Sequence, residues 1–66
     1  MAQVERAAFV QHLKEMADAI ATDMDQIRQM VQRGLMTDDE SNEILARLSG
    51  ELDTLNEMIH EFSKYL

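Results

Sequence analysis

The stretch QRGLMTDDES, residues 32–41, separates two long helical patterns and decides how the chain folds. Gly34, one of only two glycines in a chain without proline, can take the left-handed backbone conformation that ends a helix. Thr37 and Glu40 have the spacing of a capping box, which starts a helix. A calcium loop would need ligands at alternating positions over about twelve residues and a central glycine. The stretch therefore predicts a turn between two helices and no ligand site.

Apolar residues on both sides of this turn recur at alternating steps of three and four, which is the heptad pattern of packed helices. We call these residues the seam. In the first half they are Val10, Leu13, Ala17, Ile20, Met24, Ile27 and Val31, and in the second half Leu45, Leu48, Leu52, Leu55, Ile59, Phe62 and Leu66. The patterns predict one domain over residues 1–66, with helices over about 3–33 and 38–65 and a turn at 34–37. The expected fold is all-α: an antiparallel two-helix hairpin, coiled-coil-like, completed by a partner or by dimerisation to a four-helix bundle.

A second row of mostly apolar residues follows the g positions of the heptads, beside the seam. In antiparallel helices the g positions of both lie on the same side, so we expect one apolar face with paired levels. The pairs are Phe9 with Tyr65, Met16 with Met58, Asp23 with Glu51, and Met30 with Ile44. These eight residues are the predicted partner-binding site, because a two-helix pair cannot cover such a face itself. The other side, which carries the e positions, is expected to be polar. These positions are Lys14, Ala21, Arg28, Asn42, Ser49, Asn56 and Ser63.

Composition excludes several classes of function. The 66 residues carry 13 acidic and 6 basic side chains, a formal net charge of −7, which argues against nucleic acid or an anionic membrane as partner. The chain has no cysteine, and its start lacks the basic and apolar regions of a secretory signal, which fits the cytoplasm. No catalytic motif is present, no cofactor is implied, and His12 and His60 lack the third ligand of a metal site.

The layout resembles the small co-chaperones of type III secretion needle subunits, the YscE/PscE/EscE family. The similar features are the chain length, the opening MAQVE, the MVQRG that closes the first helix and LDTLNEMIHEF in the second. The resemblance implies a non-enzymatic cytoplasmic protein. It would bind a larger tetratricopeptide-like chaperone and help to keep the needle subunit from polymerising early.

The alternative is a homodimer in which two hairpins bury their g positions against each other as a four-helix bundle. The segment TDDESNEILARLSGELDTL is similar in pattern to the second helix of the Rop plasmid copy-number regulators, which bind RNA loops as such dimers. The bases of the first helix are scattered round it, which disfavours RNA binding here. The shorter SGELDTL is similar to a signature of sporulation phosphatases, with Gly50 in place of its glutamine.

Overall fold

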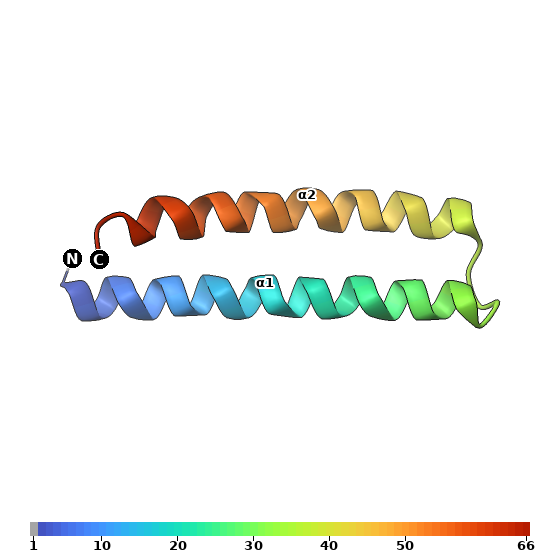
Figure 1. Ribbon diagram of the computed structural model, residues 1–66, viewed down its shortest axis with the longest axis horizontal. Helices are drawn as coiled ribbons and strands as arrows, with labels where there is room; N and C mark the ends of the chain where they lie inside the picture. Colours follow the sequence, from blue (N-terminus) through green and yellow to red (C-terminus); the bar gives the residue numbers. More distant parts are fainter. Residues whose placement is uncertain (1) are drawn as a thin grey trace.

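The chain folds as two antiparallel helices joined by a short turn. The computed structural model describes residues 2–66, in which α1 spans Gln3–Gln32 and α2 spans Asp38–Ser63. The helices lie side by side over their whole length, and the start of α1 and the end of α2 lie opposite the turn (Figure 1). The molecule measures 49 × 15 × 11 Å, which is one layer of helices. The predicted all-α hairpin is confirmed, with observed helix ends within two residues of those expected.

α1 ends in the motif that the glycine predicts. Gly34 has a φ of 76°, in the left-handed region that glycine adopts without a steric cost. The N–H of Gly34 donates to the carbonyl of Val31 (3.0 Å) and that of Leu35 to the carbonyl of Met30 (2.9 Å), the hydrogen bonds of a Schellman motif. The Leu35 side chain itself stays 68% exposed. The backbone therefore ends the helix here with little help from apolar contact.

α2 begins in a complete capping box. The Glu40 N–H donates to Thr37 Oγ1 (3.1 Å), and the Thr37 N–H donates to Glu40 Oε1 (3.1 Å). The Thr37 hydroxyl also donates to Glu40 Oε1 (2.9 Å). The backbone and hydroxyl hydrogen bonds from Thr37, in that order, lower the pKa of the Glu40 carboxyl. The carboxylate form therefore completes the cap that satisfies otherwise unpaired N–H groups at the helix start.

The core lies toward the open end of the hairpin. Its buried members Leu13, Ala17 and Leu55 are at most 8% exposed, and the half-buried residues packed against them come from both helices. The latter are Ile20, Leu52, Met58, Ile59 and Phe62. Toward the turn the seam residues are only half-buried, and the residue most enclosed there is Ser41, 4% exposed, whose hydroxyl donates to the Asp38 carbonyl (3.0 Å). Two helices thus enclose few side chains completely.

The register of the hairpin differs from the predicted one. The ring of Phe9 meets the ring of Phe62, and Arg6 lies over Tyr65. These contacts place the fold point between residues 35 and 36, in the middle of the turn, whereas the predicted pairs place it near residue 37. The expected opposition of Phe9 and Tyr65 is therefore wrong by about one helical turn. Heptad patterns can pack at more than one offset, and the turn between α1 and α2 selects the observed one.

The last predicted seam residue is also outside the seam. α2 ends at Ser63, and the N–H groups of Tyr65 and Leu66 donate to the carbonyls of Phe62 (3.4 Å) and Ser63 (3.2 Å), which is a tightened final turn. Leu66 is 52% exposed. In the observed register Leu66 would lie level with Glu5, so no apolar partner holds it.

The two glycines should respond oppositely to alanine. Nothing lies within 4 Å of a Cβ added at either Gly34 or Gly50, so only backbone preference differs. Gly34→Ala should lower the free energy of unfolding by about 1–2 kcal/mol, because alanine is strained at positive φ. Gly50→Ala, in the middle of α2, should raise it by up to about 1 kcal/mol. Urea unfolding followed by circular dichroism measures both, and equal effects of the two changes would contradict the assigned turn.

The capping box should make stability depend on pH through Glu40. Because the folded-state pKa lies below the ordinary value of 4.5, the stabilisation is present above that value and is lost as pH falls through the folded-state pKa. Near neutral pH the wild type should be more stable than Glu40→Gln, and the difference should vanish in acid. Unfolding curves for both proteins from pH about 7 down to about 3 test this; a difference that persists in acid would show that the carboxylate charge is not involved.

Candidate interaction surface

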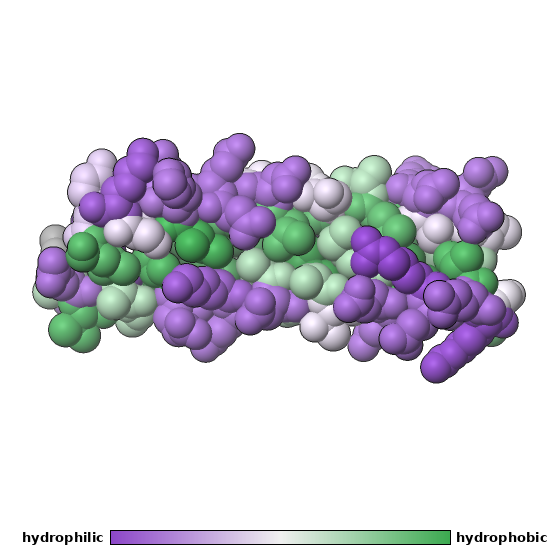
Figure 2. All heavy atoms as spheres, viewed as in Figure 1, coloured by the Kyte–Doolittle hydropathy of each residue, from purple (hydrophilic) through white to green (hydrophobic). Residues whose placement is uncertain are grey.

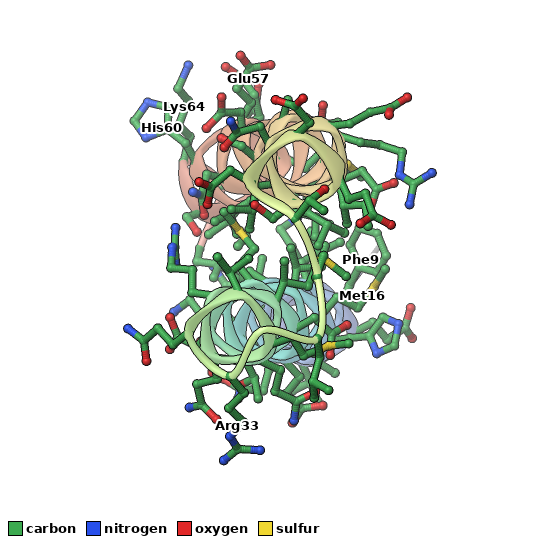
Figure 3. All side chains as sticks on the ribbon, turned by 90° about the vertical axis from the view of Figure 1, so that its right-hand side faces the viewer. Phe9, Met16, Arg33, Glu57, His60 and Lys64 are labelled. Atoms are coloured by element: carbon green, nitrogen blue, oxygen red, sulfur yellow. The ribbon has the colours of Figure 1, made fainter. Side chains whose placement is uncertain are left out.

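The two broad faces of the hairpin carry different side chains. In the end-on view, Phe9 and Met16 point to one side of the line joining the helices, while His60 and Lys64 point to the other (Figure 3). We call the first side the g face, defined by the eight residues predicted from the heptads. It is the side turned away from the viewer in Figures 1 and 2. The helical geometry therefore places the predicted row on one face of the molecule.

The apolar members of the g face are exposed or half-buried. Phe9, Met16 and Met30 are 37%, 42% and 36% exposed, and Tyr65 is 64% exposed. Ile44 and Met58 are half-buried, and Met58 packs against the core. The inner edge of the face thus continues into the core, while its outer edge meets solvent. Tyr65 belongs to the turn after α2, so its position on the face is less fixed by helix geometry than that of the others.

Two carboxylates interrupt this apolar row in the middle. Asp23 on α1 and Glu51 on α2 are both exposed, and within residues 2–66 neither takes part in an ion pair. The ion pairs of the described chain lie elsewhere, between Arg28 and Asp25 (3.1 Å) and between Lys64 and Glu61 (3.1 Å). The centre of the g face is therefore negative, and neither carboxylate is neutralised by an ion pair within the described residues.

An aromatic cluster closes the open end of the same face. The Phe9 and Phe62 rings meet edge to face at 5.1 Å between centroids, a favourable geometry for aromatic pairs. The Arg6 guanidinium lies 6.0 Å from the Phe62 centroid and 5.1 Å from that of Tyr65, a cation–π arrangement. Neither Arg6 nor Phe62 is among the eight residues predicted for the candidate site. The available signal was an arginine at a seam position, where a stacked guanidinium can replace an apolar side chain.

The opposite face is less polar than its e positions suggest. A band of apolar residues runs between the helices along this face, bordered by hydrophilic residues (Figure 2). The e positions there include Ala21, Ser49 and Ser63, whose short side chains leave the seam visible. The expected polar side is thus polar at its edges only. Four of the large exposed apolar side chains, Phe9, Met16, Met30 and Tyr65, belong to the g face.

The remaining surface has few features that could support chemistry. A shallow depression on α2 is lined by Asp53, Asn56, Glu57, His60 and Glu61. Within residues 2–66 no group of three or more histidine, aspartate or glutamate side chains is placed to hold a metal ion. Neither helix of the described chain is both long and apolar enough to cross a membrane. The g face is therefore the strongest candidate for a functional surface.

Comparisons with protein-family models, with curated proteins and with solved structures find no match to this chain.

The observed register predicts unequal roles for the two aromatic residues near the end of the chain. Phe62 packs against the core and the Phe9 ring, so Phe62→Ala should lower the free energy of unfolding by about 2 kcal/mol. Tyr65→Ala should cost less than about 1 kcal/mol, because Tyr65 is 64% exposed and contacts Arg6. Thermal or urea unfolding measures both. A larger loss of stability for Tyr65→Ala than for Phe62→Ala would instead support the register in which Phe9 faces Tyr65.

Proposed function

We propose that this protein is a non-enzymatic interaction module, a helical hairpin that docks on another protein through its g face. The observation that carries the proposal is the row of half-exposed Phe9, Met16 and Met30 on one face, directly beside the core. Large apolar side chains gathered on one face of a small protein mark an interaction site more often than a free surface. Methionine suits such a site because its flexible side chain adapts to the partner.

The small size of the core supports the same proposal. In a two-helix pair each seam residue has neighbours on one side only, and the buried apolar residues of the described chain are Val10, Leu13, Ala17 and Leu55. A single core in a chain of this size supplies only about 3–5 kcal/mol unless disulfides, metals or association add to it. The chain has no cysteine. A partner on the g face would extend the core and stabilise the hairpin by mass action.

The resemblance to needle-subunit co-chaperones gives this proposal its most specific form. The partner would be a larger tetratricopeptide-like chaperone, whose concave helical surface could accept the g face. Together the two proteins would keep a type III secretion needle subunit unpolymerised in the cytoplasm. The competing form is self-association through the same face as a four-helix bundle.

Charged substitutions on the g face should abolish partner binding and leave the hairpin folded. Met16→Asp with Met30→Asp, at two exposed positions of the face, should lose a partner that the wild type retains when the tagged chain is purified from its own cells. A carboxylate buried in an apolar interface without a counter-charge costs several kcal/mol. Mass spectrometry identifies the partner, and circular dichroism checks that the variant stays helical.

Ala21→Asp with Asn56→Asp provides the matched control, since it adds the same number of charges at e positions on the opposite face. The control should retain the partner. Light scattering on the purified wild type separates the two forms of the proposal: a species of twice the chain mass indicates the homodimer. Retention of the partner by the methionine variant would exclude the g face as the docking surface.

A further inference from the structure

We propose that the g face binds an amphipathic helix of the partner, and that this helix carries a lysine or arginine at the centre of its apolar side. The inference rests on the proposed docking role of the g face. Two carboxylates without an ion-pair partner, Asp23 and Glu51, lie among apolar side chains near the middle of the g face. The partner's chemistry follows from what these residues require when they are covered.

The shape of the face fits a helix. Its residues on α1 run from Phe9 to Met30, about 30 Å at the rise of an α-helix. The two helices form a single layer 11 Å thick, so a third helix laid along the g face, in contact with both, begins a second layer. Such packing buries the apolar ridge of the third helix between two others, as in helical bundles. About twenty residues of partner helix would span the face.

The charge of the face requires a cation on that helix. Covering Asp23 and Glu51 with apolar side chains alone would remove two carboxylates from water without compensation, which is costly. None of the eight g-face residues is basic. Arg47, four residues before Glu51 on α2, forms no ion pair with Glu51 within residues 2–66. A partner lysine or arginine at mid-length can reach either carboxylate, since in the observed register Asp23 and Glu51 are offset by about three residues, roughly 4.5 Å along the hairpin. Paired in this way, the charges fix the register of the partner.

The wider charge of the hairpin favours the same partner. Within α2 the ionisable residues other than histidine are Asp38, Asp39, Glu40, Glu43, Arg47, Glu51, Asp53, Glu57 and Glu61. This imbalance gives the molecule a negative field on one of its two helices. Such a field attracts a basic segment and speeds its association at low salt.

A second copy of the chain fits the g face less well. Each copy has a formal net charge of −7 and no basic g-face residue. If two g faces met with their turns at the same end, carboxylates would face carboxylates. With the turns at opposite ends, they would face apolar side chains instead. If the g face of one copy instead packed on the opposite face of the next, where Lys14 and Arg28 lie, copies would add head to tail without closing into a dimer.

A displayed library of helical peptides tests the inference. Each peptide is about twenty residues long, with a fixed apolar stripe and a randomised position at its centre. The library is selected on the immobilised wild-type chain and on Asp23→Lys with Glu51→Lys. A matched control, Asp18→Lys with Glu57→Lys, makes the same charge change at outer helix positions. Circular dichroism checks that all variants are helical.

Lysine or arginine should be enriched at the central position on the wild type and on the control, and aspartate or glutamate on the g-face variant. The selected basic peptides should bind the g-face variant about five- to tenfold more weakly than the wild type. Enriched peptides with no charge preference at the centre would overturn this inference and leave the proposed docking function standing.

Two other results would overturn the inference in different ways. If the wild type retains no more peptide than Met16→Asp with Met30→Asp, the face does not bind helices, and the proposed function fails as well. If light scattering shows that the mass of the wild type grows with concentration and Asp23→Lys with Glu51→Lys stops that growth, the carboxylates serve stacking of copies.

Discussion

The closed turn at residues 33–37 is the constraint on which the rest of this structure depends. Its two ends are fixed by backbone chemistry: a left-handed glycine that satisfies the last carbonyls of α1, and a capping box that satisfies the first N–H groups of α2. Between them the chain has no freedom to slide one helix along the other. The turn therefore sets which seam residues meet and places the Phe9 ring against Phe62.

A hairpin of two helices can form all its backbone hydrogen bonds and still leave its apolar side chains partly exposed to solvent. Each seam residue packs across one interface, and within residues 2–66 no side chain is fully buried. The same apolar surface is then partly buried by folding and further buried by binding. A partner that covers Phe9 and Met16 also covers the outer edge of the core. The stability of such a chain should rise when it is bound, because ligands that bind only the folded state stabilise it.

Carboxylates in the middle of an apolar face have different effects in the free and the bound protein. While the face is open to water, Asp23 and Glu51 are hydrated and interrupt a surface that would otherwise be continuously apolar. When the face is covered, the same groups must be matched by a cation or remain costly. Aromatic and methionine side chains at either end supply contact area. In this arrangement the apolar side chains supply the affinity for a partner, and the carboxylates supply the specificity.

The sequence by itself determined the two helices, the chemistry of the turn and the face on which the g positions lie, because these follow from backbone caps and from a period of 3.6 residues. Only the tertiary structure decided the register, because heptad seams can pack at more than one offset and the turn selects one. It also moved Leu66 out of the seam and brought Arg6 over the rings of Phe62 and Tyr65. Those contacts join residues at opposite ends of the chain, which no local pattern could pair.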